Sequence, residues 1–539
     1  MKNKHMKYDI IGYMMLFTLF FSMIISGILW WFDITIQPFI FPLSCLLSIF
    51  FFSRFLTQNF LEIFAFLALL SISILLNWAV PDMSWDGQAY HQPMVYALAK
   101  GWNPIIDSHN HIIDVKWGMN IWIDHYLKGW EISAATLFST TGVIETGKTV
   151  NTMLMTSVLM ISIYILNDIK IVMSTFKRVL YVIILGFPVV FVNYGFTFYI
   201  DVATYYLVFW IFALLYLIEK SGISMTTRLV LFVVVFMGAA IKWNIFFWIC
   251  YFVGFYCLYQ LYLKKYKILL SLICTSVCSL VLVLMTVIYN PFVTNVEEHG
   301  NPFYPIGTEM AEDIGNNALP KLLKDKNRFS QVLISLFSRP NDNSETPYLN
   351  PYHISYRYNI RSLGSGAKIG GGGLFFIEVF IISLVLLFVC KNERFQNKIF
   401  CITILFLFSL FILPMGSNYR YIPFISLLPI FLLLYAESIG SKCNFINCLK
   451  VLCMFFLSLN TFVGIPFFIK NTYLAAKNQS QAIEYIKNIK HEHPFHSKNW
   501  SFNYKMNGNN IPYDEIFSNN NDDYYELPNQ QGPPIFLYK

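Results

Sequence analysis

Long apolar runs recur along almost the whole chain, with polar residues gathered between them. Runs of roughly 18–22 apolar residues suit a helix that crosses about 30 Å of hydrocarbon, whereas membrane-barrel strands would show about ten residues of alternating hydrophobicity. A window of about 19 residues predicts thirteen membrane-spanning helices, near residues 9–31, 36–53, 60–80, 148–167, 179–195, 202–218, 229–243, 245–263, 268–289, 374–390, 398–415, 421–438 and 450–468.

Three long polar segments interrupt this pattern, at 81–147, 290–373 and 469–539. The predicted fold class is therefore an all-α polytopic membrane protein. Residues 1–468 form its transmembrane domain with two large loops, and a partly irregular tail follows. Within the second loop, residues 321–337 have apolar side chains at helical spacing, which is typical of a short amphipathic helix on a membrane surface.

The distribution of Lys and Arg predicts the orientation of the chain. Basic residues occupy the short loops that alternate with the long segments, as expected of cytoplasmic loops. The basic start MKNKHMKY precedes the first apolar run without a small-residue cleavage site, so we expect a retained first helix with the N-terminus inside. The three long segments and the C-terminus then lie outside. The Ile, Lys and Asn bias is typical of an AT-rich bacterial genome, so we expect a bacterial cytoplasmic (inner) membrane protein.

Composition excludes other classes. Hydrophobic residues make up 56% of the chain and charged residues 13%, against about 45–50% and about 25% in soluble domains. A compact soluble fold has too little interior for this apolar content, and a net charge of only +7 argues against disorder. The ten cysteines all fall in predicted spans or inner loops, so we expect no outer disulfide.

Ionisable side chains are concentrated in the first outer loop. Asp86 follows the third predicted span by a few residues, beside Trp85, which suits the depth of the membrane surface. The helical apolar spacing over 89–98 places Asp86 near a helix start. The dense set comprises Asp82, Asp86, His91, Asp107, His109, His111, Asp114, Asp124, His125, Lys128 and Glu131. Together they predict a site that faces outward.

Several short motifs resemble the GT-C superfamily of membrane glycosyltransferases. WDGQAYHQP, GWNP, HYLKGWEISAA and TGVIETGK resemble its first outer loop, and HGNPFYP (299–305) and NYRYIPF (418–424) resemble segments of uncharacterised bacterial members. The resemblance implies eleven to thirteen helices, an Asp in the first long outer loop and a sugar donor carried on polyprenyl phosphate. In this chain three predicted spans, rather than one, precede that loop.

The resemblance and the chemistry together nominate the site residues. Transfer from a lipid-phosphate sugar needs a base for the acceptor hydroxyl, and Asp86 is the candidate. The leaving phosphate needs cations, for which Lys128, Lys242 and Arg420 are candidates. The full set of substrate-binding candidates is His91, Lys128, Asp201, Lys242, Arg420 and Tyr421.

Each nominated residue has a structural alternative. Helix capping is the alternative for Asp86 and also for Asp201, which resembles the second acidic position of the superfamily. Snorkelling of a long side chain at the membrane interface is the alternative for Lys242 and Arg420. For His91, core packing and substrate contact weigh equally.

The sequence assigns no metal ligands and no certain cofactor. His109-Asn110-His111 and His491-Glu492-His493 are His-x-His pairs without the helical spacing or paired Cys typical of metal sites. A divalent ion held by Asp and His of the first loop remains an open alternative, because some members of the superfamily use one.

The sequence thus predicts a hexosyl- or pentosyltransferase, inverting at the sugar. We expect a polyprenyl-phosphate sugar donor, a glycan, lipid or protein acceptor, contact with membrane lipid and no nucleic-acid partner. The first alternative is an O-antigen-type polymerase or ligase, since Arg361 and Gly372 match a pattern proposed for polymerases. The second is a lipid-linked sugar flippase or transporter, although the span centres are almost free of charge.

Overall fold

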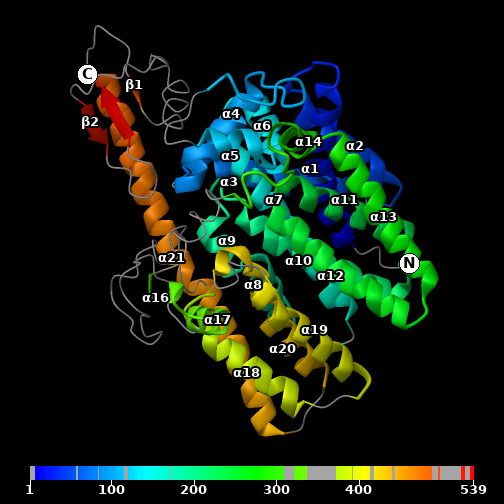
Figure 1. The fold of residues 1–539 in the computed structure, drawn as a ribbon. Coiled ribbons are helices and arrows are strands. Elements are labelled where there is room, and N and C mark those ends of the chain that lie inside the picture. Colours follow the sequence, from blue (N-terminus) through cyan, green and yellow to red (C-terminus); the bar gives the residue numbers. More distant parts are fainter. Residues whose placement is uncertain are drawn as a thin grey trace.

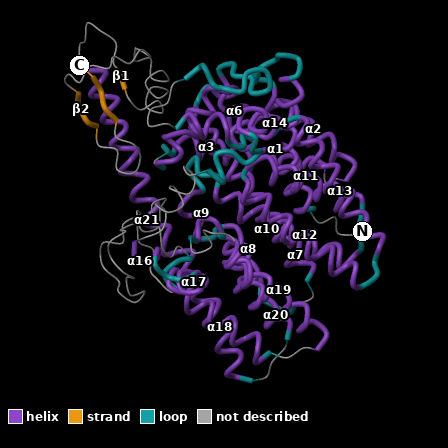
Figure 2. The backbone as a smooth tube through the Cα atoms, viewed as in Figure 1, coloured by secondary structure: helices purple, strands orange, loops and turns teal. Residues whose placement is uncertain are grey.

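The computed structural model describes residues 6–55, 59–82, 84–113, 119–169, 171–308, 321–336, 372–390, 393–412, 418–439, 443–488, 496–497, 524–527 and 535–538. Most of these residues are helical (Figures 1 and 2). The longer helices are α1 (Tyr8–Trp30), α2 (Ile40–Phe52), α3 (Asn59–Ala79), α6 (Gly129–Thr141), α7 (Thr149–Asp168), α8 (Thr175–Gly186), α10 (Asp201–Ser221), α11 (Met225–Ile241), α12 (Trp243–Tyr262), α13 (Tyr266–Met285), α14 (Tyr289–His299), α18 (Phe376–Val389), α19 (Glu393–Ile412), α20 (Leu427–Ser438) and α21 (Asn444–Asn488).

Short helical pieces fill the segments between them. Several of these carry the residues of the candidate site, as described below. They are η1 (Ser53–Phe55), η2 (Gly87–His91), α4 (Gln92–Ala99), α5 (Asn120–His125), η3 (Ile144–Lys148), α9 (Val189–Tyr194), α16 (Lys321–Lys324), α17 (Arg328–Leu336), η5 (Tyr419–Tyr421) and η6 (Pro423–Ser426).

Helix α1 lies at the centre of the bundle. It packs against α2, α3, α6, α7 and α11, and most of its residues are buried. Small and polar side chains join the helices there, as when the Ser22 and Ser133 hydroxyls meet at 2.8 Å and the Trp210 indole donates to Ser157 at 2.9 Å. Such contacts satisfy polar groups that have no water to pair with inside a helical bundle.

Seven helices of the described part are long and apolar enough to cross a membrane: Tyr8–Trp30, Phe60–Ala79, Ile144–Asp168, Asp201–Ser221, Trp243–Tyr262, Tyr266–Met285 and Asn444–Leu474. The outer helices expose large apolar side chains, including Phe60 and Phe64 on α3 and Leu270 on α13. An apolar surface of this extent suits contact with lipid rather than water. The structure therefore supports a helical membrane protein with several spanning helices.

Five further apolar helices have 10–17 residues: Ile40–Phe52, Met225–Ile241, Phe376–Val389, Asn397–Ile412 and Pro423–Ser438. The predicted span at 179–195 is not one helix, since α8 ends at Gly186 and α9 begins at Val189. Pro188 explains the break because proline has no backbone N–H to continue the hydrogen-bond ladder. The count of thirteen spans stays a prediction.

The chain turns sharply between the helices that correspond to the predicted spans at 229–243 and 245–263. Helix α11 ends at Ile241, Lys242 is extended (φ −159°, ψ 139°), and α12 begins at Trp243. A single extended residue, Lys242, thus separates the end of α11 from the start of α12. This position becomes important for the site.

The C-terminal region differs from the rest of the molecule. Helix α21 continues through residue 469, where the tail was predicted to begin, and extends along one side of the molecule in Figure 1. Beyond it lie three short strands, β1 (His496–Ser497), β2 (Tyr524–Leu527) and β3 (Ile535–Tyr538). They form an antiparallel sheet in the order β1-β3-β2, with Tyr524 opposite Tyr538. The sequence pattern did not indicate these strands.

Candidate active site

Four charged side chains from distant parts of the sequence form one connected cluster. The Lys242 Nζ donates to Asp201 Oδ1 at 2.6 Å, and the Arg420 Nε donates to Asp201 Oδ2 at 2.7 Å. The Arg420 Nη2 also donates to Asp86 Oδ2. Asp86, Asp201, Lys242 and Arg420 are called the ion-pair cluster below. It contains two carboxylates and two cations, so its formal charges balance.

The cluster is buried at one side and accessible at the other. The Asp201 side chain is fully buried, whereas those of Arg420 and Asp86 are 17% and 15% exposed. Although burial alone would lower the pKa of Arg420, the carboxylates of Asp201 and Asp86 raise it well above its ordinary value. Arg420 is therefore a permanent cation at the accessible side, and Asp201 is the buried anchor beneath it.

Helix capping does not explain either aspartate. Asp86 precedes η2 and makes no side-chain capping hydrogen bond, and Asp201 begins α10 without capping it. Both carboxylates instead face cations from other segments. Lys242 and Arg420 both contact the buried carboxylate of Asp201.

Tyrosine rings surround the charged groups. The Arg420 guanidinium carbon lies 4.6 Å from the centre of the Tyr199 ring, and the Lys242 Nζ lies 5.5 Å from that of Tyr421. Such cation–π contacts favour a desolvated cation. The Tyr90 hydroxyl donates to Asp86 Oδ2 at 3.2 Å. Burial raises the pKa of Tyr90, so this phenol remains a proton donor to the carboxylate.

Asp82 organises the turn that carries Asp86. Its carboxylate accepts hydrogen bonds from the Ser84 hydroxyl at 2.8 Å, the Gln92 amide at 2.8 Å and the Phe198 backbone at 3.3 Å. A side chain on Gly87 would collide with Ser84 and Asp82. The absence of a Cβ at Gly87 therefore allows η2 to lie directly on this turn. Asp82 thus positions the Asp86 segment.

Other side chains hold the remaining segments. Asn151 of α7 donates to the backbone oxygens of Thr197 at 3.1 Å and Tyr199 at 3.0 Å, which fixes the chain just before Asp201. The Trp248 indole of α12 donates to the Tyr421 oxygen at 3.1 Å. These contacts fix the segments that carry Asp201 and Arg420 to packed helices of the bundle.

Two nominated residues lie in contacts outside the ion-pair cluster. His91 Nδ1 is 2.5 Å from Glu131 Oε1, and both side chains are buried. This pair packs η2 against α6, which agrees with the packing alternative for His91. Lys128 is buried, and its Nζ donates to the oxygens of Asp124 at 2.8 Å and Tyr126 at 3.0 Å and to Asn290 Oδ1 at 2.7 Å.

The environment of Lys128 gives it a structural role. An ammonium group has three donors, and all three are used in these contacts. No donor is left for a substrate phosphate. Burial also lowers the pKa of Lys128 to about 7, which makes it a poor permanent cation.

Sequence reasoning missed several members of the site. Tyr90 lies four residues after Asp86, one helical turn along, and Tyr199 lies two residues before Asp201. Each lies close in sequence to a nominated residue. The chain has 33 tyrosines, however, so the position of a single tyrosine does not mark it as part of a site. Asp114 and Arg361, named in the sequence analysis, fall outside the described residues.

No family model, curated protein or solved structure that was compared with this chain matches it. The function is therefore inferred from the composition of the site and from its geometry. The resemblance of the short motifs to the GT-C superfamily remains an expectation.

Proposed function

We propose that this protein is a polytopic membrane glycosyltransferase of the GT-C type. It transfers a hexose or pentose from a polyprenyl-phosphate donor to an extracytoplasmic glycan, lipid or protein, and inverts the sugar carbon. Asp86 is the general base. The observation that supports this most is the convergence of Asp86, Asp201, Lys242 and Arg420 in one partly accessible cluster.

The charge arrangement matches what the reaction needs. The acceptor oxygen attacks the anomeric carbon as its proton passes to the Asp86 carboxylate. The bond between that carbon and the phosphate oxygen breaks, and the electron pair remains on the lipid phosphate. Since a phosphate leaves without being protonated, one carboxylate base suffices, unlike the carboxylate pair of glycosidases. Arg420 and Lys242 stabilise the developing phosphate charge.

Arg420 pairs with Asp86 in the structure. An arriving phosphate competes with Asp86 for the Arg420 guanidinium, which binds phosphate in a planar, bidentate manner. Displacement of Asp86 from this pair frees its carboxylate to accept a proton. Asp201 is fully buried, so it continues to hold Arg420 and Lys242 in place while the phosphate binds.

We further propose the membrane arrangement that the sequence predicts. Thirteen spans place the N-terminus in the cytoplasm and the C-terminus outside, in the bacterial inner membrane. The described helix ends at Asp86, Asp201 and Lys242 then lie on the outer side. Arg361, on which the polymerase alternative was based, lies outside the described residues.

The test of this proposal is a transfer assay with the full chain in proteoliposomes. Radiolabelled hexosyl and pentosyl polyprenyl phosphates are supplied one at a time, with an extract of bacterial envelope glycans, lipids and proteins as acceptors. We expect label to move from one of these donors to an acceptor, at a rate that depends on protein concentration. Failure of every donor to lose its sugar, in protein that is monodisperse and correctly inserted, would contradict the proposal.

A further inference from the structure

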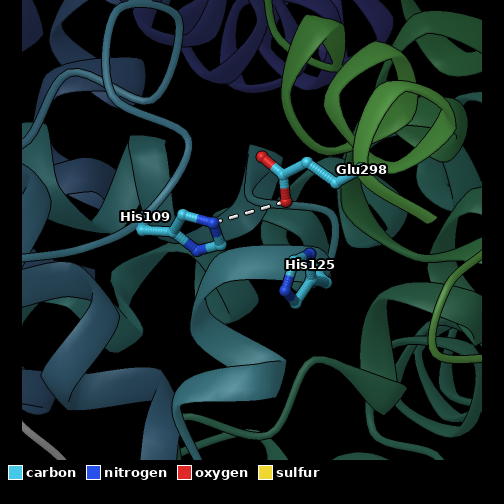
Figure 3. Close-up of side chains that lie close together, drawn as sticks. All are labelled: His109, His125 and Glu298. Carbon is cyan, nitrogen blue, oxygen red and sulfur yellow. Dashed lines mark ion pairs between the residues drawn. The ribbon is translucent and has the colours of Figure 1, made fainter.

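A second group of side chains lies outside the ion-pair cluster. His109 comes from the loop after Asp107, His125 is the last residue of α5, and Glu298 lies near the end of α14 (Figure 3). His109, His125 and Glu298 are called the histidine cluster below. One ligand atom from each of them lies within 4.8 Å of the others.

The spacing of these atoms suits a small metal ion. The His109 Nε2 lies 3.3 Å from Glu298 Oε2. In a tetrahedral zinc site with ligand bonds of about 2.0–2.2 Å, two ligand atoms are about 3.3–3.5 Å apart. The histidine–carboxylate distance therefore matches this geometry, and a ligand atom of His125 lies within 4.8 Å of both.

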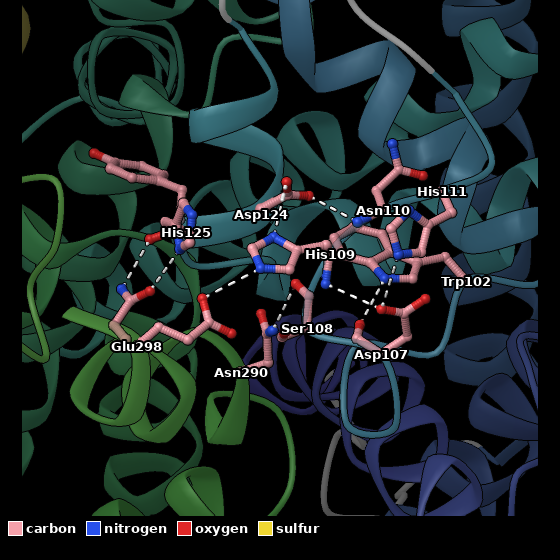
Figure 4. Close-up of polar contacts among 12 residues, drawn as sticks. Trp102, Asp107, Ser108, His109, Asn110, His111, Asp124, His125, Asn290 and Glu298 are labelled. Atoms are coloured by element: carbon pink, nitrogen blue, oxygen red, sulfur yellow. Dashed lines mark hydrogen bonds and ion pairs between the residues drawn. The ribbon is translucent and has the colours of Figure 1, made fainter.

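Each imidazole has a polar partner at its Nδ1, and Figure 4 shows the contact between His109 and Asp124. The His109 Nδ1 lies 3.4 Å from Asp124 Oδ2, and the His125 Nδ1 lies 2.8 Å from Asn295 Oδ1. In metal sites, histidine ligands generally donate this second N–H to a carboxylate or an oxygen, which fixes the tautomer and the ring orientation. Each contact leaves Nε2 as the nitrogen available to a metal.

We propose that the histidine cluster binds a divalent transition-metal ion, with zinc as the preferred ion. Two imidazoles and one carboxylate form a zinc ligand set, whereas magnesium and calcium prefer oxygen ligands alone. The His109 and Glu298 side chains are 45% and 29% exposed, so the ion is reachable from solvent and water can occupy its fourth position. This proposal does not depend on the transferase function.

The bound ion would connect two segments that are far apart in the sequence. His109 and His125 belong to the first long loop, and Glu298 belongs to α14 in the second. Helix α5 contacts both α14 and η2, and Asp86 immediately precedes η2. A metal at the histidine cluster therefore fixes α5 against α14 and, through α5, supports the segment that carries Asp86.

Aromatic packing offers a competing role for part of the cluster. The His125 ring lies 4.9 Å from the rings of both His299 and Tyr304, edge to face, and His299 stacks on Tyr304 at 3.7 Å. Packing alone requires neither Glu298 nor the orientation of His109. The carboxylate of Glu298 therefore distinguishes metal binding from packing.

The test measures metal directly. The full chain is purified in detergent through a tag without histidine, stripped with a chelator, dialysed against zinc chloride and freed of loose zinc. We expect about one zinc ion per chain by mass spectrometry of the metal. Substitution of cobalt for zinc is expected to give the visible absorption typical of tetrahedral coordination.

Glu298→Gln and His111→Ala are the informative variants. Glu298 is on the surface of α14, so its substitution leaves the fold intact, and we expect the bound zinc to be lost. His111 is a 74% exposed histidine two residues from His109, and His111→Ala should keep the zinc. Asp124→Asn, which weakens the orientation of His109, should lower zinc affinity about 10-fold.

Each alternative result would overturn the proposal. Stripped wild-type protein that takes up no zinc has no such site. Equal zinc content in wild type and Glu298→Gln would show that other groups hold the ion. Loss of zinc in His111→Ala together with retention in Glu298→Gln would place the ion on the exposed loop instead.

Discussion

Asp86 and Arg420 lie 334 residues apart in the sequence, yet the Arg420 guanidinium donates directly to the Asp86 carboxylate. The same guanidinium holds Asp201 through its Nε at 2.7 Å. Arg420 thus bridges a buried carboxylate and a partly exposed one. Only the exposed partner can be displaced by a ligand without leaving a buried charge unpaired. We therefore propose Asp86 for the reaction and Asp201 for its support.

Arg420→Lys tests the geometry of the cation. Lysine keeps the charge but lacks the planar fork that can contact Asp201 and a phosphate together. We expect the turnover number to fall about 10²–10³-fold, as when one donor to a developing anion is removed. Steady-state kinetics of sugar transfer measure this turnover number. Arg228→Lys, at an exposed position, should keep wild-type rates, and an unchanged turnover number in Arg420→Lys would remove Arg420 from the phosphate site.

Asp201 and Lys242 should be energetically coupled. Removal of one partner of a buried ion pair costs about 3–5 kcal/mol, because the other charge is left buried and uncompensated. We expect Asp201→Asn to lower the thermal stability in detergent strongly. In a cycle with Lys242→Met, the double variant should lose less than the sum of the single losses, by about 0.5–3 kcal/mol. Additive losses would show that the contact is not energetically significant.

Lys128 predicts a pH dependence of stability. Its pKa falls from an ordinary 10.5 to about 7 on folding, because of burial. Between these values the unfolded chain binds the additional proton, so the free energy of unfolding rises with pH from about 7 to about 10.5 and is level outside that window.

Lys128→Met isolates this effect. The substitution removes three hydrogen bonds, so the variant is less stable than wild type, and the difference should widen as the pH rises from 7 to 10.5. Thermal unfolding in detergent at several pH values measures the unfolding midpoints of wild type and of Lys128→Met. A constant difference across this range would mean that Lys128 has an ordinary pKa in the folded protein.

The helices could be predicted well from the sequence because apolar run length is a local property. Pro188 shows where this fails, since a run that is apolar throughout still breaks where a backbone N–H is missing. The short strands of the tail escape prediction for another reason. Tyr524–Leu527 and Ile535–Tyr538 pair with each other across a polar segment, and short strands with little alternation carry almost no local signal.

The site was predictable only in part. Asp86 and Asp201 were chosen with the help of the resemblance to the GT-C superfamily, and Lys242 and Arg420 as cations for the leaving phosphate. The structure brings these four together. Lys128 was also chosen as a cation for the phosphate, but it is buried among backbone oxygens. Sequence shows which residues carry charge, whereas the direction of a side chain depends on tertiary packing.

The histidine cluster could not be predicted from the sequence either. His109 and His125 are separated from Glu298 by more than 170 positions, and no spacing rule joins them. The spacing of His109-Asn110-His111 is not typical of a metal site, so the sequence assigned no metal ligand there. In the structure His109 faces Glu298, whereas the His111 Nε2 lies 3.5 Å from Asp107.

The most direct test of the transferase proposal is the initial rate of sugar transfer by Asp86→Asn, which keeps the size and shape of the side chain but cannot act as a base. Asp107→Asn is the matched control, since that carboxylate lies in the same loop and is 46% exposed. With the donor that supports wild-type transfer, we expect Asp86→Asn to lose about 10²–10⁴-fold in rate while inserting normally, and Asp107→Asn to match wild type. Wild-type transfer rates in Asp86→Asn would contradict the assignment of Asp86 as the base.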